Sequence, residues 1–142
     1  MNSRTICAIA ITLVALLLAA CGGISEAEKH HNAANEFREQ GDWQEAIIEY
    51  DEAIKLDPQL ALAYYNRGVA YHYLGQPKQA LEDYDEALRL DPKHASAYAN
   101  RAQANTLLER DKKAQQDVDR AVELGFDRIL LENAIEVAKS LR

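Results

Sequence analysis

Two segments of this 142-residue chain recur at a spacing of 34 residues, and this repetition restricts the folds open to it. The segment YDEAIKLDP, which begins at Tyr50, returns as YDEALRLDP at Tyr84. The segment AYYNRG, which begins at Ala63, returns as AYANRA at Ala97. Both lie in stretches whose apolar residues follow helical spacing. A fixed period of this length in helical sequence is typical of a solenoid built from stacked helical hairpins.

The period divides the chain into three units, residues 27–60, 61–94 and 95–128. Proline ends the second helix of the first two units, because it lacks an amide donor and clashes with the preceding turn. The third unit has Gly125 instead, and Asp127 is placed to cap a final helix over residues 128–142. We therefore predict an all-α fold of seven helices and no strands. The alternative is that the last helix is the start of a truncated fourth unit, and this alternative predicts the same seven helices.

Local signals agree with these boundaries. Ser25 and Glu28 have the spacing of a capping box that opens the first helix, and Asp42 with Glu45 repeats it at the second. Pro77 stands at the opening turn of a later helix, where its missing N–H costs nothing.

The units resemble the tetratricopeptide repeat, in which small residues let the two helices of a hairpin pack closely. The corresponding positions here are all alanine or glycine: Ala34, Ala46, Ala53, Gly68, Ala80, Ala87, Ala102, Ala114 and Ala121. The family's larger residues are supplied by Phe37 with Tyr50 and by Tyr71 with Tyr84. The third unit departs from this pattern, with Asn105 in the place of an aromatic residue. The resemblance implies a right-handed superhelix of three units followed by a C-terminal capping helix.

The N-terminal sequence has the features of an export signal. One positive charge precedes an apolar run that ends in Leu18-Ala19-Ala20-Cys21, which resembles the lipobox of bacterial lipoproteins. The resemblance implies a signal peptide at residues 1–20, acyl chains such as palmitate on Cys21, and a short spacer to residue 26. Gly22 after the cysteine implies the periplasmic face of the outer membrane if the source is Gram-negative. The alternative is an ordinary secreted protein with an incidental cysteine.

Composition and side-chain spacing exclude several classes of function. A net charge of −7 argues against a nucleic-acid binder. His30 and His31 are adjacent and point in different directions on a helix, and His72 and His94 are isolated, so each is expected to be solvated or to face a partner. The acidic run at 82–86 lacks calcium-loop spacing and is interpreted as a solvated face. We expect neither an enzyme, nor a cofactor, nor a metal site.

Function is therefore expected on the concave face, which the first helix of each unit lines in this family. The predicted partner-binding residues are Asn32, Asn35, Leu62, Tyr65, Asn66, Val69, Tyr73, Asn100 and Gln103. Asn32, Asn66 and Asn100 occupy one position in the three units and form a ladder of amides. The ladder either contacts the backbone of a bound peptide or supports packing between helices.

One subfamily clamps the terminal carboxylate of chaperone tails with two asparagines and three basic residues. The asparagines correspond to Asn35 and Asn66, but the basic residues correspond to His31, Ser96 and Asn100. A terminal carboxylate would lack its charge-assisted partners, so we exclude this clamp.

The sequence thus predicts a lipid-anchored scaffold or adaptor in the bacterial cell envelope that binds a protein or peptide segment in its groove. The alternative is a structural protein that assembles with copies of itself.

Overall fold

The computed structural model describes residues 24–142, all of whose regular structure is helical. Residues 1–23, with the expected signal peptide and Cys21, lie outside the described residues. The seven helices are α2 (Glu26–Gln40), α3 (Trp43–Leu56), α4 (Ala61–Tyr73), α5 (Pro77–Leu90), α6 (Ala95–Leu107), α7 (Asp111–Glu123) and α8 (Arg128–Ser140). Within the described part of the chain this confirms the prediction of seven helices and no strands.

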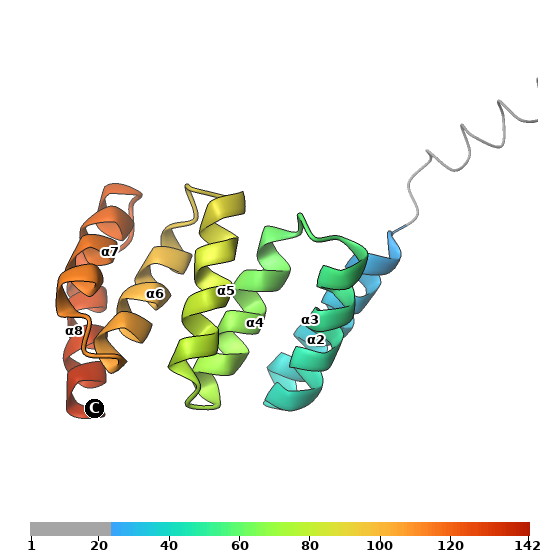
Figure 1. Cartoon of the computed structure of the whole chain (residues 1–142), viewed down its shortest axis with the longest axis horizontal. Coiled ribbons are helices and arrows are strands. Elements are labelled where there is room, and N and C mark those ends of the chain that lie inside the picture. The colour runs from blue at the N-terminus through green and yellow to red at the C-terminus, as the bar shows by residue number, and fades with distance from the viewer. Residues whose placement is uncertain (1–23) are drawn as a thin grey trace, which may run out of the picture.

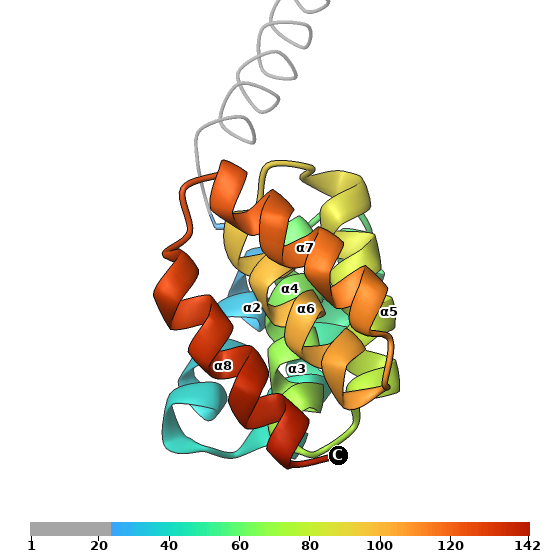
Figure 2. The same ribbon diagram turned by 90° about the vertical axis from the view of Figure 1, so that its left-hand side faces the viewer.

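The helices form three hairpins, α2–α3, α4–α5 and α6–α7, which stack along the long axis of the molecule (Figure 1). Each hairpin contacts the next, and α8 packs against α6 and α7 at the end of the array (Figure 2). The arrangement is the predicted superhelix of helix-turn-helix units with a C-terminal helix.

Small side chains set the close approach of the helices. All nine alanine and glycine positions named above are buried. At Gly68, an added Cβ would lie 2.8 Å from Cε1 of Tyr84. The buried tyrosines Tyr50 and Tyr84 fill the remaining space inside the first two hairpins. The core therefore combines many small residues with a few large aromatic side chains.

The helix caps follow the sequence signals at two of three places. The Ser25 hydroxyl accepts from the Glu28 amide at 3.1 Å, and the Glu28 carboxylate accepts from the Ser25 amide at 2.9 Å. Asp127 caps α8 by accepting from the Leu130 amide at 2.9 Å. The capping box expected at Asp42 is wrong, because its backbone (φ −84°, ψ 69°) is not extended and its side chain accepts no cap hydrogen bond.

The turn inside each hairpin needs a left-handed residue. Gly41 (φ 84°) and Gly75 (φ 68°) supply it in the first two units. The third unit places Glu109 there, with φ 59°. A residue with a Cβ is strained in this region. The left-handed conformation therefore recurs at this position in all three units, even where the residue is not glycine.

Ion pairs between arginine and aspartate also recur with the period. Arg67 Nε and Nη2 donate to the two carboxylate oxygens of Asp83 at 2.8 and 2.6 Å, and Nη1 donates to Asp51 of the preceding unit at 2.5 Å. Thirty-four residues later Arg101 repeats both contacts, with Asp117 and Asp85. Each arginine thus links the two helices of its own hairpin and attaches that hairpin to the one before.

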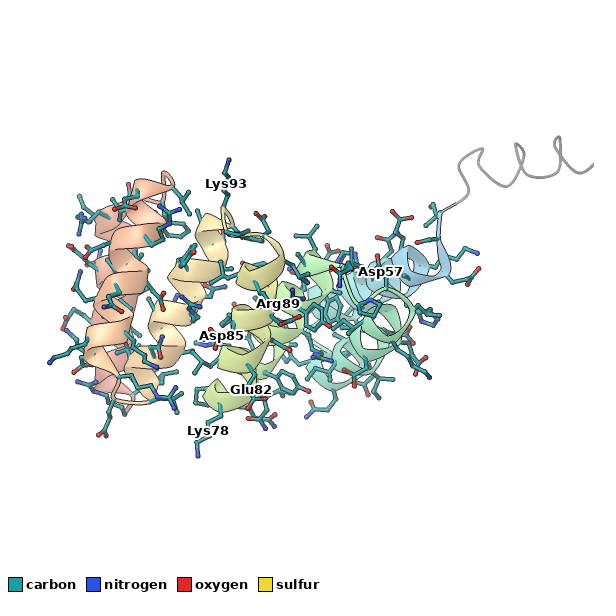
Figure 3. All side chains as sticks on the ribbon, turned by 45° about the horizontal axis from the view of Figure 1, so that its top comes forward. Asp57, Lys78, Glu82, Asp85, Arg89 and Lys93 are labelled. Atoms are coloured by element: carbon teal, nitrogen blue, oxygen red, sulfur yellow. The ribbon has the colours of Figure 1, made fainter. Side chains whose placement is uncertain are left out.

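This arrangement corrects the interpretation of the acidic run. Asp83 is 5% exposed and paired with Arg67, so it does not belong to a solvated face. Glu82 and Asp85 are exposed, and Figure 3 shows them along the surface of α5. Neighbouring residues on one helix turn point in different directions, and of the acidic residues in this run only Asp83 is buried.

The C-terminal helix covers α6 and α7 with Leu131 and Ala138, which are buried. The face of α8 that points away from α6 and α7 carries several apolar side chains, although it is exposed to solvent. Apolar side chains exposed there are Ile129, Leu130, Val137 and, just past the helix, Leu141.

Candidate functional site

A groove of about 530 Å³ opens between the first helices of the units. It is lined by Arg38, Tyr65, Val69, His72, Tyr73, Tyr84, Asn100 and Gln103. Five of the residues predicted to bind a partner are therefore brought together: Tyr65, Val69, Tyr73, Asn100 and Gln103. The other four, Asn32, Asn35, Leu62 and Asn66, do not line this groove.

The asparagine ladder makes contacts within the protein. Asn66 is 8% exposed, and its Nδ2 lies 3.1 Å from Nε2 of His31 and 3.3 Å from Oδ1 of Asn35. In the next unit, Asn100 Nδ2 donates to the Tyr65 hydroxyl at 3.2 Å. Each amide therefore joins the first helix of its unit to that of the unit before. Packing accounts for these two residues, whereas Asn32 is exposed.

The two buried tyrosines of the repeat differ in their hydrogen bonding. Tyr50 donates to Oδ1 of Asn35 at 2.7 Å, and burial raises its pKa to about 12. In the second unit the position of Asn35 is taken by Val69, which cannot accept a hydrogen bond. The Tyr84 hydroxyl is buried at the groove near Asn100 and finds no acceptor for its hydrogen, and burial raises the pKa of Tyr84 as well. A buried hydroxyl without a partner is uncommon and requires an explanation.

Arg38 brings a positive charge to the groove from the last turn of α2. Its Nε is buried and makes no hydrogen bond, and none of the ion pairs within residues 24–142 includes it. No acidic residue lines the groove. The groove is thus locally positive in a chain whose net charge is −7.

His72 and an aromatic pair complete the wall. Nδ1 of His72 is buried without a partner, and burial lowers the pKa of His72, so the ring is neutral at neutral pH. Tyr73, which is 65% exposed, stacks on Trp43 with ring centroids 4.2 Å apart. This stack presents a flat apolar surface beside the polar groups.

Sequence reasoning missed Arg38, His72 and Tyr84 as groove residues. Arg38 and His72 occupy one position in successive units, 34 residues apart. The concave surface of the family includes that position, so the period could have identified both. Tyr84 was assigned to the core, where it also lies; its unused hydroxyl becomes visible only when Val69 is seen opposite it.

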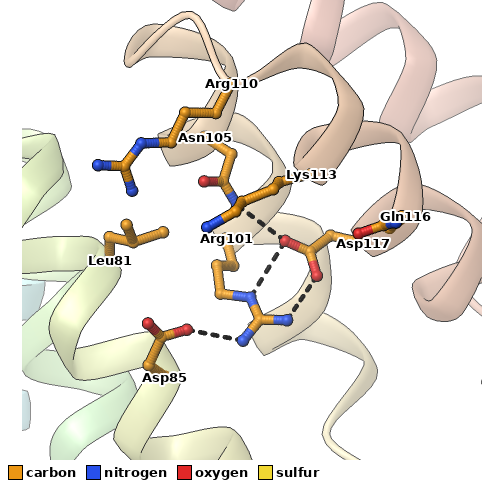
Figure 4. Close-up of a pocket in the computed structure, with 8 residues that line it drawn as sticks. All are labelled: Leu81, Asp85, Arg101, Asn105, Arg110, Lys113, Gln116 and Asp117. Carbon is orange, nitrogen blue, oxygen red and sulfur yellow. Dashed lines mark hydrogen bonds and ion pairs between the residues drawn. The ribbon is translucent and has the colours of Figure 1, made fainter.

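A second pocket, of about 260 Å³, lies where the third unit departs from the repeat. In the second unit the guanidinium of Arg67 lies 6.0 Å from the ring centre of Tyr71. Asn105 replaces this ring in the third unit and donates to Asp117 at 3.0 Å, which leaves space beside Arg101 (Figure 4). Three basic and two acidic side chains line this space.

The described residues contain no cluster of histidine, cysteine or acidic side chains that could hold a metal ion. None of the helices within residues 24–142 is long and apolar enough to cross a membrane.

Comparisons with known proteins agree with the fold. Residues 34–75 match the sequence family described as TPR repeat, and residues 61–94 match the tetratricopeptide repeat family. No curated protein sequence matches the chain.

Several solved structures are similar. The second TPR domain of Spaghetti (RPAP3), bound to the HSP90 peptide SRMEEVD, is 30% identical with a TM-score of 0.69; the match covers 70% of this chain and 93% of that one. The TPR domain of Arabidopsis OM64 is also 30% identical, with a TM-score of 0.71 and coverages of 84% and 95%. The TPR2B domain of yeast Sti1, in complex with pHsp70, is 27% identical, with a TM-score of 0.72 and coverages of 82% and 98%.

Proposed function

Because the chain belongs to the tetratricopeptide repeat family, we propose that it is a membrane-anchored scaffold in the bacterial cell envelope, which binds a segment of a partner protein in its concave groove. The observation that carries this proposal is the groove itself, which combines an exposed aromatic stack with buried polar groups that have no partner in the protein. Polar groups placed beside an aromatic surface can fix the orientation of a bound ligand.

An extended peptide is the occupant that suits the groove. Its length runs across helices α2, α4 and α6, so a bound segment would contact successive units one after another. The similar RPAP3 and Sti1 domains were solved with chaperone-derived partners. The occupant here differs from theirs in one respect, because the positions of the chaperone clamp hold His31, Ser96 and Asn100.

The binding face is best tested at Tyr73, which is exposed, and at Gln103, which is half-buried, since replacing Asn66 would also disturb the packing between α2 and α4. The variant that joins Tyr73→Ala to Gln103→Ala removes groove surface. Gln116→Ala, at an exposed position of α7, is the matched control. We expect the double variant to lose the partner captured from detergent-solubilised envelopes while the control retains it. Equal capture by both variants would contradict a groove-binding role.

The proposed membrane anchor rests on Cys21 and the sequence around it. Since α2 begins at Glu26, the chain from the cysteine to the first helix is short, at most about 17 Å when extended. The repeats would then lie against the membrane surface. Cys21→Ser should move the protein from the membrane fraction to the soluble fraction, and the mass of the wild-type N-terminal peptide should show acyl chains. An unmodified Cys21 in the membrane fraction would exclude this anchor.

A second candidate, self-assembly, is favoured by the apolar side chains exposed on α8. Val137 and Leu141 are 59% and 73% exposed, and they lie on one face at helical spacing. If copies associate through this face, the protein's size in light scattering should rise with its concentration, and Val137→Glu should abolish that rise. A constant monomeric mass would exclude self-assembly.

A further inference from the structure

We propose that the pocket between α5, α6 and α7 binds a small, soluble phosphate monoester that also carries a hydroxyl, such as a polyol phosphate or a sugar phosphate. The pocket has a volume of about 260 Å³ and shares no lining residue with the concave groove. The proposal therefore does not depend on what the groove binds.

The pocket exists because a ring of the repeat is missing. In the second unit Tyr71 packs against the core, and its ring centre lies 6.0 Å from the guanidinium of Arg67. Asn105 stands 34 residues later, and its shorter side chain leaves the equivalent space beside Arg101 open. At about 30 Å³ for each water molecule, this space corresponds to roughly eight waters. A phosphate with a few carbon atoms fits that volume.

The buried amide of Asn105 supplies an acceptor to this space. Asn105 is 2% exposed, and its Nδ2 donates to Oδ2 of Asp117 at 3.0 Å. Because a carboxylate only accepts hydrogen bonds, this contact fixes the orientation of the amide. Its carbonyl oxygen is buried, accepts no hydrogen bond and points away from Asp117 (Figure 4). A buried acceptor without a donor is costly, and a ligand hydroxyl would satisfy it.

The entrance to the pocket has charges that the second unit lacks. Arg110 and Lys113 are exposed, and neither takes part in any ion pair within residues 24–142. The equivalent residues of the second unit are Gln76 and Gln79. The same unit that lost the ring has therefore gained two cations beside the open space.

The acidic residues of the pocket have partners of their own. Asp85 and Asp117 pair with Arg101 at 2.7 and 2.6 Å. Figure 4 shows Asp85 on the far side of Arg101 from Asn105, whereas Arg110 and Lys113 extend toward the Asn105 end. An anion is therefore favoured at the Asn105 end of the pocket.

Two cations at one end favour a doubly charged group. A phosphate monoester carries a charge of about −1.5 to −2 at neutral pH, whereas a carboxylate carries a single negative charge. Arginine and lysine both bind phosphate oxygens well. The phosphate would lie between Arg110 and Lys113, its hydroxyl would donate to the Asn105 carbonyl, and the carbon atoms between them would contact Leu81.

Calorimetric titration of the full-length chain in detergent micelles tests this assignment. Glycerol phosphate or glucose phosphate should bind, methyl phosphate and glycerate should bind more weakly, and glycerol should not bind. Absence of binding by both hydroxylated phosphates would overturn the proposal, and so would glycerate binding as tightly as glycerol phosphate. Phosphatidic acid in the micelles, which has the phosphate but no hydroxyl, should not compete; competition would overturn a soluble ligand in favour of a lipid headgroup.

Two exposed residues test the position of the phosphate. Arg110→Met and Lys113→Met should each weaken the binding of glycerol phosphate about tenfold or more, because a charge-assisted hydrogen bond is lost. Lys112→Met is the matched control, since it removes a neighbouring cation that does not line the pocket, and it should bind as the wild type does. Equal losses in all three variants would overturn the site, because they would follow from the change in overall charge.

Restoring the ring of the repeat tests the pocket itself. Asn105→Tyr places the side chain of Tyr71 at the equivalent position, and it should abolish binding of glycerol phosphate without changing the capture of a partner by the groove. In the wild-type protein, which needs no variant to fold, glycerol phosphate should shift the side-chain amide resonances of Asn105. Binding that persists in Asn105→Tyr, or resonances of Asn105 that do not move at saturation, would overturn the proposal.

Discussion

Tyr50 donates its hydroxyl hydrogen to Oδ1 of Asn35 at 2.7 Å, and this bond joins the two helices of the first hairpin. The second hairpin keeps the tyrosine as Tyr84 but loses the acceptor, because Val69 stands opposite. One exchange within a repeat thus leaves a buried hydroxyl without an acceptor in the protein.

This relationship predicts opposite results for two identical substitutions. Tyr50→Phe should lower the free energy of unfolding by about 1 kcal/mol, since a satisfied hydrogen bond is removed. Tyr84→Phe should leave the stability unchanged or raise it, because a buried donor without a partner is removed. Urea denaturation of both variants measures the difference, and equal losses would mean that the Tyr84 hydroxyl has an acceptor within the protein.

The periodic ion pairs predict a large effect at Arg67. Its replacement in Arg67→Met leaves the buried Asp83 carboxylate without a partner and should cost about 3 kcal/mol. Arg89→Met breaks the exposed pair with Glu86 and should change the stability little, because solvent screens an exposed ion pair. Thermal unfolding compares the two, and similar losses would show that the buried pair inside the second hairpin contributes no more to stability than an exposed pair.

The turn of the third unit can be improved. Glu109→Gly should raise the free energy of unfolding by about 1 kcal/mol, since glycine adopts the left-handed conformation of Glu109 without strain. Gly75→Ala is the reciprocal change at the equivalent turn, where an added Cβ meets nothing within 4 Å, and should lower stability by a similar amount. A loss on Glu109→Gly would contradict the assigned strain.

Stability should fall on acidification because of two histidines. Burial lowers the pKa of His31 and of His72, and the Arg38 charge lowers that of His31 further. In the unfolded chain both titrate near the ordinary value of 6.5. The unfolded state therefore takes up protons first as the pH falls below about 6.5, and the free energy of unfolding decreases across that range.

His72→Gln isolates the part of this dependence that arises in the groove. The variant should show a smaller loss of stability between neutral pH and pH values below 6.5. Denaturation curves at several pH values provide the measurement. A slope unchanged from the wild type would mean that His72 is not desolvated.

The repeat made the fold predictable from the sequence. The contacts of individual side chains could not be predicted in the same way. The period identifies every hairpin because small residues, prolines and turns recur together. It does not reveal that Asp83 points inward while Glu82 and Asp85 do not, since that depends on the pairing of Arg67 with two helices at once. The missing cap at Asp42 has a similar origin, because backbone angles decide whether a side chain reaches its amide.

The candidate site was only partly predictable for the same reason. Comparison of repeat positions with the family identified residues whose side chains line the groove, such as Tyr73 and Gln103. Which of them remain free depends on contacts between units, and these engage Asn66 and leave Arg38 unpaired. Sequence spacing places a residue on a face, but it does not say whether a neighbour has already used its polar atoms.

The central claim is that the partner lies in the groove, and site-specific photo-crosslinking in cells tests it most directly. A photoreactive phenylalanine derivative in place of Tyr73 or Gln103 should form a covalent adduct of one constant size upon irradiation. The same residue in place of Glu82, exposed on α5, should form none. An adduct formed from Glu82 and absent from both groove positions would contradict the account.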